Sequence, residues 1–371
     1  MKNFFVNLSV VFVTLLLLAL GAEVVLRFLP VYDGFSFLAV NDQNPTFRAT
    51  PNRIVQVSKG WNFVLANKKN VNNAGFLNKQ DYTEKGIRPL VAVVGDSYVE
   101  ALQVTDEEPY FELLSQANPG VRVYSFGFSG AGLSQYLAWI KFAHDSYHND
   151  YLIVNVVGND YDESLKKYKF QRGFYLYDID DNGDLPLVRH DWAMNPIIKL
   201  FHCSALARYL VYNLHVLDVV AMLKHRFSKQ EDYAGNVAAS VDQERENDSY
   251  RAVDAFLRDL PAYSGLSYQK VLFVIDADRS VVYNPSSEYV AQSNKTYVAK
   301  MSEYLKLQAT KLGCTVIESV DVFAKDYQQH KQRFEFAKEA DWHWNSRGHR
   351  IIAEAIQRSD WWRGGVSDER L

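Results

Sequence analysis

The sequence predicts an α/β fold in which a parallel sheet is covered by helices on both faces. Five short runs rich in β-branched and aromatic residues show no polar alternation, which is typical of strands buried on both sides. Helical spacing separates several of these runs. The order β-α-β-α-β and, after a long interruption, β-α-β-α favours a parallel sheet. The five predicted strands are 90–94, 121–126, 152–157, 271–275 and 315–317.

The helix after the first strand has recognisable ends. Thr105 and Glu108 have the spacing of a capping box at its start, and Asn118-Pro119-Gly120 is a typical stop. Further helices are predicted from their 3.6-residue spacing at 133–144, 297–312 and 347–357.

The interruption between the third and fourth strands, 161–269, is too long for a simple crossover and is expected to contain structure of its own. Runs 174–179 and 185–189 flank the turn sequence Asp-Asp-Asn-Gly-Asp, which predicts a β-hairpin. Beyond it, 195–224 predicts one or two helices. The following stretch, 230–249, is polar and acidic, which indicates a loop.

Composition limits the function classes. The chain has 371 residues, 48% of them hydrophobic and 23% charged, so it is a folded protein rather than a disordered or collagen-like chain. Its 40 Lys and Arg residues nearly balance 44 Asp and Glu residues, which gives no electrostatic reason to expect a nucleic-acid partner. Cys203 and Cys314 are too few for a disulfide scaffold and lack metal-site spacing, although a single bridge stays open.

The amino terminus is directed to a membrane. The run 4–22 contains no charge over 19 residues, long enough at ~1.5 Å per residue to cross the hydrocarbon core of a bilayer. We expect an uncleaved anchor at 1–25; the alternative is a signal peptide with its cleavage site at Ala19-Leu20-Gly21. Because Lys2 precedes the run, the positive-inside rule places the amino terminus in the cytoplasm and the body outside it, in the periplasm of a bacterium.

These features divide the chain into four parts. After the anchor, 26–88 is a juxtamembrane segment of mixed polarity without clear periodicity. The α/β domain is expected at 89–360, with its insertion at 161–269, and 361–371 is assigned as a tail.

Three positions that can serve chemistry follow successive predicted strands. Ser97 comes directly after the first strand, Gly130 after the second and Asn159 after the third. Carboxyl ends of parallel strands meet at one edge of the sheet, where ligands bind in open α/β folds. Ser97 is thus a candidate nucleophile. Its own N–H, a backbone N–H near Gly130 and the side-chain amide of Asn159 are candidate donors to an oxyanion.

An attacking serine needs a base and a group that orients this base. Among nine histidines, His343 is the best placed, because it lies just before the helix predicted at 347–357, which Asn345 or Ser346 can cap. Asp341 precedes it by two residues. One loop can therefore turn both side chains inward, so that the carboxylate orients the imidazole.

Taken together, Gly-Asp-Ser97, Ser-Gly130, Gly-Asn159-Asp and the carboxy-terminal Asp341-x-His343 resemble the four blocks of the SGNH/GDSL hydrolase superfamily, over about residues 90–356. The resemblance implies a flavodoxin-like three-layer sandwich and no cofactor. By position it implies Ser97 as nucleophile, with His343 and Asp341 completing the triad. It also implies Ser97, Gly130 and Asn159 as the donors of the oxyanion hole.

Two positions depart from the family pattern. Tyr98 stands where the family has leucine, and one residue separates Asp341 from His343 where many members have two. Membrane-associated polysaccharide O-acetyltransferases of related fold also have an Asp-x-His pair. The resemblance therefore implies acyl transfer as an alternative to hydrolysis.

We expect an anchored serine esterase that hydrolyses small O-acyl esters, such as acetyl esters, of a small molecule or an envelope saccharide through an acyl-serine intermediate. Three alternatives stay open: O-acyl transfer to an envelope saccharide, hydrolysis of a lipid or lysophospholipid ester, and a binding or scaffold protein on the same fold. Trp342 and Trp344 are candidate sugar-stacking residues, with core packing as the alternative. His349 is expected to be structural.

No metal or cofactor is predicted. The stretch 178–183 resembles the start of a calcium loop, but its twelfth position is Arg189 rather than glutamate. Asp160, Asp162 and Glu163 are more typical of a solvated turn, or of side chains that support a site, than of a metal centre.

Overall fold

The computed structural model describes residues 2–84, 86, 89–217, 233–234, 237–238, 241–336 and 341–366. Its central sheet has five parallel strands in the order β11-β10-β5-β3-β4. This is the flavodoxin-like order, in which the first strand of the domain lies inside the sheet. The predicted sheet is confirmed. Its strands are β3 (Leu90–Gly95), β4 (Arg122–Gly127), β5 (Tyr151–Val157), β10 (Val271–Asp276) and β11 (Thr315–Glu318).

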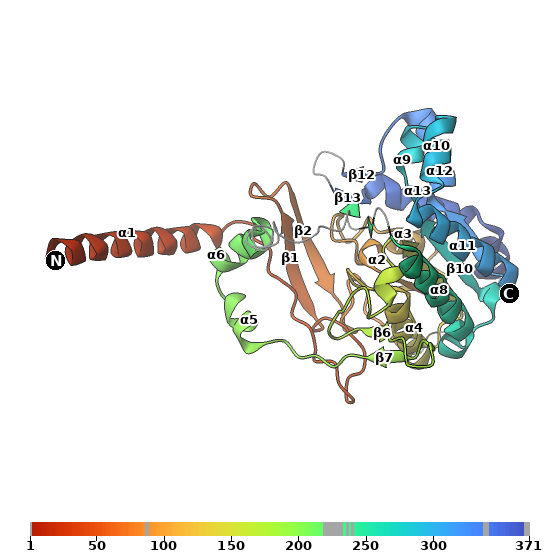
Figure 1. The fold of residues 1–371 in the computed structure, drawn as a ribbon, viewed down its shortest axis with the longest axis horizontal. Helices are drawn as coiled ribbons and strands as arrows, with labels where there is room; N and C mark the ends of the chain where they lie inside the picture. Colours follow the sequence, from red (N-terminus) through yellow and green to blue (C-terminus); the bar gives the residue numbers. More distant parts are fainter. Residues whose placement is uncertain are drawn as a thin grey trace.

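Helices cover both faces of the sheet (Figure 1). Side chains of β3 alternate between two cores: Ala92 and Val94 pack into one, and Val91 and Val93 into the other. This double burial explains why the strands read as unbroken apolar runs. The first core is closed by α4 (Leu133–Tyr147), α8 (Gln243–Ser264) and α11 (Tyr297–Leu312), and the second by α3 (Tyr110–Ala117), α12 (Ser319–His330) and α13 (Ser346–Arg358).

Helix starts were harder to predict than helix spans. One of the two capping-box bonds forms, from the backbone N–H of Thr105 to the Glu108 carboxylate, but the Thr105 hydroxyl also donates to this carboxylate and does not accept from the N–H of Glu108. However, α3 begins only at Tyr110, after Pro109, so the predicted box closes a turn before the helix rather than the helix itself. At α13 the prediction is confirmed, because the Asn345 side chain accepts from the N–H of Gly348 at 3.0 Å.

The insertion contains the predicted hairpin, formed by β6 (Tyr175–Tyr177) and β7 (Leu187–Arg189). Two short helices follow, α5 (Pro196–Phe201) and α6 (Ala205–Arg208), while 218–224 lies outside the described residues. The loop prediction for 230–249 is wrong from Gln243 onward, where α8 begins. Its acidic residues are helix-start residues: Asp242 accepts from the N–H of Arg245, and Glu244 lies in the positive first turn. Most of 230–240 lies outside the described residues, apart from β8 (Tyr233–Ala234) and β9 (Val237–Ala238).

The amino-terminal helix α1 (Lys2–Leu26) projects from the body (Figure 1). Over Asn3–Leu26 it is long and apolar enough to cross a membrane, and none of its apolar window is buried in the protein. A signal sequence has the same length and composition.

The juxtamembrane segment folds against the α/β body. Its strands β1 (Arg53–Lys59) and β2 (Leu65–Val71) form an antiparallel hairpin, and Val55, Val57 and Phe76 enter the first core. At the other end, Trp362 and Val366 are buried in the second core, so the packed body continues past residue 360. Both cysteines are free. Further short helices and strands are α2 (Ser97–Glu100), α9 (Ser280–Tyr283), α10 (Ser287–Ser293), β12 (Glu335–Phe336) and β13 (Asp341–Trp344).

Candidate active site

Ser97 opens the one-turn helix α2 directly beyond β3. The side chain of Asp96 caps this helix, since its Oδ1 accepts from the N–H of Tyr98 at 3.0 Å. A short polar cap of this kind stabilises a helix start that would otherwise leave its N–H groups unpaired. The sequence Gly-Asp-Ser therefore holds the serine at the carboxyl edge of the sheet.

One cavity of about 520 Å³ brings together Ser97, Gly130, Asn159 and His343. The first three follow β3, β4 and β5, which are neighbours in the sheet, and His343 lies on β13. The sequence places these residues up to hundreds of positions apart, and the topology brings them to one edge. The cavity is also lined by Asp96, Ser129, Glu163, Tyr168, Lys169 and Arg245.

Asp341 is bonded directly to His343. Its Oδ1 lies 2.6 Å from His343 Nδ1 and also accepts from the backbone N–H of His343 at 3.1 Å. Its other oxygen, Oδ2, accepts from Lys59 Nζ at 3.0 Å. Burial would raise the pKa of Asp341, but the bonds from His343 and Lys59 outweigh it and hold this pKa well below its ordinary value. The ionised carboxylate favours a proton on Nδ1, which leaves Nε2 free to accept one.

The Ser97 hydroxyl donates to Asp96 Oδ2 at 2.9 Å. Both Ser97 and His343 are among the described residues, and no hydrogen bond joins their side chains. A rotation about the Cα–Cβ bond of serine redirects its hydroxyl, and catalytic bonds of this type commonly form only once substrate is bound. Asp96 is thus a resting partner of the hydroxyl, and burial raises the pKa of its carboxyl.

The two oxyanion candidates beyond Ser97 have donors to offer. Gly130 adopts φ +81°, a conformation that disfavours any residue with a Cβ, and among the described residues its N–H has no acceptor. Asn159 Nδ2 donates one N–H to Glu163 Oε2 at 2.9 Å, which leaves its second N–H unused. Glu163, itself paired with Lys169, thereby fixes the orientation of the Asn159 amide.

Glu100 supports the turn that carries Gly130. It is the last residue of α2 and accepts from the backbone N–H of Ser129 at 3.0 Å and from the Ser129 hydroxyl. Burial raises the pKa of Glu100 to about 7, although the bonds from Ser129 act in the opposite direction. A carboxyl that titrates near neutral pH therefore lies directly behind the candidate oxyanion hole.

We expect this carboxyl to make stability depend on pH. Between the ordinary pKa of 4.5 and about 7 the folded state binds more protons than the unfolded state, so stability falls as pH rises through this window. Through this window Glu100 lowers the free energy of unfolding by up to roughly 3 kcal/mol. In denaturant titrations of the full chain in detergent, Glu100→Gln should gain stability over the wild type at pH 8 but not at pH 5. An equal difference at both values would contradict this assignment.

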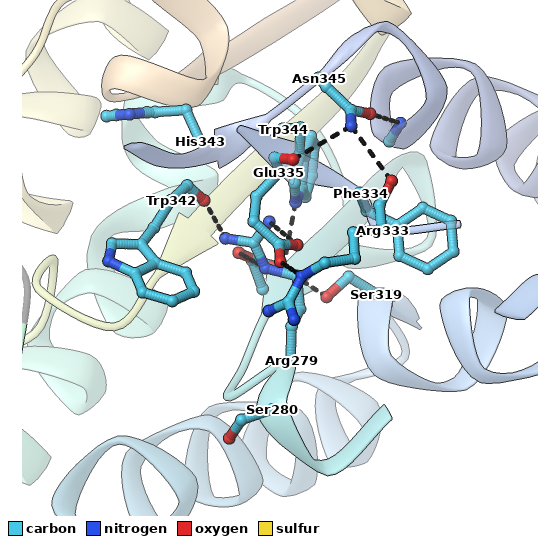
Figure 2. A network of polar contacts seen from close by, with 12 residues as sticks. Arg279, Ser280, Ser319, Arg333, Phe334, Glu335, Trp342, His343, Trp344 and Asn345 are labelled. Carbon is cyan, nitrogen blue, oxygen red and sulfur yellow. Dashed lines mark hydrogen bonds and ion pairs between the residues drawn. The ribbon is translucent and has the colours of Figure 1, made fainter. Parts of the chain in front are cut away.

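A buried network holds the segment that carries His343 (Figure 2). Arg279 follows β10, and its guanidinium donates to the carbonyl of Trp342 and to the Tyr98 hydroxyl, the latter at 2.8 Å. Arg279 Nε also lies 3.4 Å from Asp276 Oδ2. The segment is therefore tied to both β10 and α2, which carries the serine.

The two candidate stacking residues differ. Trp344 is 0% exposed, packs edge-on against Tyr98, and donates its indole N–H to Asp276 at 3.2 Å, so the prediction that it stacks on a sugar is wrong. Strand alternation does not separate the two, because residues 342 and 344 lie on the same side of β13; the packing of Trp344 in the second core does. Trp342 is 55% exposed, and Figure 2 shows its indole directed away from the network. It stays a candidate.

The carboxylates after β5 have protein partners. Asp160 accepts from the N–H of Val157 and the hydroxyl of Tyr136, both at 2.8 Å, and Asp162 pairs with Arg245 at 2.6 Å. No cluster suited to a metal ion occurs in the part of the chain that the structure describes.

His349 is buried beneath the site, and burial, followed by the charge of nearby Lys69, lowers its pKa to about 3. These contacts are those of structural residues.

Sequence reasoning missed Lys59. It lies at the end of β1, 282 positions before its partner Asp341, and only the packing of the hairpin brings the two together. Glu100 and Glu163 lie within four residues of predicted site positions, so sequence proximity was a usable signal for them. For Lys59 no local signal exists.

We expect Lys59→Met to lower kcat for an aryl acetate by about 3- to 10-fold, because Asp341 would lose a partner that is partly exposed and screened. Removing a cation also favours protonation of the adjacent imidazole, so the acidic limb of the pH–rate profile should move to higher pH. Lys59→Arg should restore most of the loss. Lys79→Met, which breaks an exposed pair with Glu107, is the matched control. A rate loss without any change in the pH profile would count against positioning by charge.

No family model matches the chain, and no curated protein matches its sequence. Similar solved structures include a member of the lipolytic G-D-S-L family from Veillonella parvula, with 11% identity and a TM-score of 0.37 over 76% of this chain and 99% of that one. An acetylxylan esterase from Geobacillus stearothermophilus has 13% identity and a TM-score of 0.36, covering 75% and 98%. A lipase from a goat rumen metagenome has 15% identity and a TM-score of 0.38, covering 72% and 96%. None of these similarities assigns an activity to this chain.

Proposed function

We propose that this chain is a serine esterase with Ser97 as nucleophile. The observation that carries the proposal is the convergence of Ser97, Gly130, Asn159 and His343 on one cavity, with Asp341 bonded to the far side of the imidazole. These are a nucleophile, two oxyanion donors, a base and the group that orients the base. Acyl transfer from an ester needs this set of parts.

The reaction runs in two halves. His343 Nε2 takes the proton of the Ser97 hydroxyl as its oxygen attacks the ester carbonyl, and the N–H groups at Ser97, Gly130 and Asn159 stabilise the oxyanion. Collapse expels the alcohol, which receives the proton from His343, and leaves an acyl-serine. Water then attacks the acyl carbonyl while His343 Nε2 takes its proton. Collapse breaks the bond to the Ser97 oxygen, which recovers the proton from His343, and releases the carboxylic acid. Asp341 stabilises the imidazolium in both halves without taking its proton.

The cavity lining favours a small acyl group on a polar alcohol such as a saccharide. The side chains that face it beyond Ser97 are hydroxyls, amides and paired charges, among them Glu163 with Lys169 and Arg245 with Asp162. A long acyl chain would leave these groups desolvated without partners, which costs free energy. Exposed Trp342 offers an aromatic face to a sugar ring beside His343.

The proposal is tested by measuring how fast the full-length protein in detergent hydrolyses aryl esters of increasing acyl length. We expect acetate to be the best acyl group, with turnover falling steeply for longer chains, and a fluorophosphonate to label Ser97. Better turnover of octanoate would favour the lipid esterase. If transfer of the acetyl group to an added oligosaccharide is faster than its hydrolysis, the enzyme is an O-acyltransferase that forms the same acyl-serine intermediate.

In this proposal α1 is retained as an anchor and the body lies outside the cytoplasm, periplasmic in a bacterium. The proposal is supported by the apolar length of α1 and by Lys2 ahead of it. Protease treatment of intact spheroplasts should digest the body and spare the anchor. Release of the body as a soluble, shortened protein would instead identify α1 as a signal peptide.

A further inference from the structure

The side of the body next to α1 exposes an unusual density of apolar residues. No residue of α5 is buried, although four of its six side chains are large and apolar, and Leu200 is 72% exposed. Soluble surfaces tolerate single exposed residues such as Leu307 on α11, but contiguous ones indicate a binding surface. We call this surface the α1-proximal face: Phe28, Leu29, Trp61, Val64, Ile197, Ile198, Leu200 and Phe201.

The α1-proximal face is fixed to the end of α1. Glu23, in the last turns of α1, accepts from the Ser204 hydroxyl and the Leu206 N–H, both at 2.8 Å, and so caps α6. Leu26 is buried with Ala205 in a small core against which Phe63 packs. Figure 1 shows α5 and α6 on the side of the body from which α1 projects.

The turn between β1 and β2 is part of the same arrangement. The Tyr209 hydroxyl, just after α6, donates to the carbonyl of Trp61 at 2.7 Å, and Asn213 donates to the carbonyl of Gly60 at 3.3 Å. Trp61 itself is 72% exposed. Tryptophan is enriched where proteins meet the headgroup region of a bilayer.

We propose that the α1-proximal face lies in the headgroup and upper acyl region of the bilayer that α1 enters. The apolar window of α1 is not buried in the protein, whereas Leu26 at the end of the helix packs with Ala205, so the bilayer surface falls at the level of Glu23 and α6. Helix α5 directly precedes α6 in the chain, which places its exposed side chains near this level. A short helix with an apolar face there behaves as an interfacial helix, and its burial in lipid removes the exposed area from water.

The test uses the free cysteines of the chain itself. Cys203, between α5 and α6, is exposed and Cys314 is buried, so a thiol-reactive fluorophore labels the full chain at Cys203. The labelled protein is reconstituted in phosphatidylcholine vesicles that contain brominated phosphatidylcholine. A matched control carries Cys203→Ser and Leu307→Cys, with the label on α11. We expect bromine quenching at least twofold stronger at position 203 than at 307.

A second variant separates lipid contact from tethering. Leu200→Asp with Phe201→Asp changes two side chains that are 72% and 54% exposed and lie outside the core, so the fold and the anchor should be kept, and quenching at Cys203 should fall to the level of the control. Equal quenching at 203 and 307, or unchanged quenching in the aspartate variant, would overturn the proposal. In the unlabelled protein, cross-linking of Cys203 between two copies would assign the face to a second copy. This result, in place of quenching, also overturns the proposal.

Discussion

Replacing Ser97 by alanine is expected to lower kcat for an aryl acetate by about 10⁴-fold or more while the fold stays intact. The change removes the atom that attacks the carbonyl, and the remaining oxyanion donors and binding contacts supply only a residual acceleration over water. The hydroxyl has one protein partner in the resting state, Asp96, so its loss disturbs little else. Steady-state hydrolysis and fluorophosphonate labelling of the full chain measure the effect.

Ser287→Ala, at an exposed position on α10, is the matched control and should keep both activity and labelling. If Ser97→Ala retained serine-dependent labelling, another serine would be the nucleophile. If the wild type neither hydrolysed simple esters nor reacted with the probe, the chain would be a binding or scaffold protein on this fold.

His343→Ala should cause a loss of similar size, about 10⁴-fold in kcat. Without the imidazole the Ser97 hydroxyl keeps the Asp96 carboxylate as its hydrogen-bond partner, but this carboxylate lacks the arrangement of His343, whose protonated form Asp341 stabilises from the far side. KM should change far less than kcat, since the imidazole acts mainly in the transition state.

His330→Ala is the matched control, because His330 is half-exposed on α12 and pairs with Asp326 on the same helix. Asp341→Asn gives a graded test of the same machinery. It should retain more activity than His343→Ala, since the imidazole remains but loses the charge that orients and stabilises it. Full activity of His343→Ala would refute the base assignment while leaving the nucleophile in place.

The sheet could be predicted because its information is local. Residues of β3, β5 and β10 are buried throughout, so each strand is an apolar run that stands out from its neighbours. The site candidates followed from the same local fact, since residues after parallel strands meet at one edge. That Ser97, Gly130, Asn159 and His343 line one cavity is consistent with that reasoning. Their catalytic roles stay predictions.

Other features of the structure depend on contacts between residues that lie far apart in the sequence, so no short stretch of sequence predicts them. The hairpin of β1 and β2 lacks a clear period because Ile54 is exposed and Lys69 is buried, and Lys59 reaches Asp341 across most of the chain. At Trp344 the residue type suits a sugar platform and a core equally well, and only its packing in the second core decides. The start of α8 was missed because helix-capping acids have the composition of a loop.

In the anchored esterase proposed above, the bonds between Glu23 and α6 have a consequence for how the protein meets its substrate. A body on a flexible linker samples a hemisphere of heights above the membrane, whereas a body clamped to the end of its spanning helix keeps one height and one tilt. Its cavity then sweeps a thin layer parallel to the bilayer as the helix diffuses laterally. Ester groups within that layer are met by a two-dimensional search, and those above or below it are not met at all.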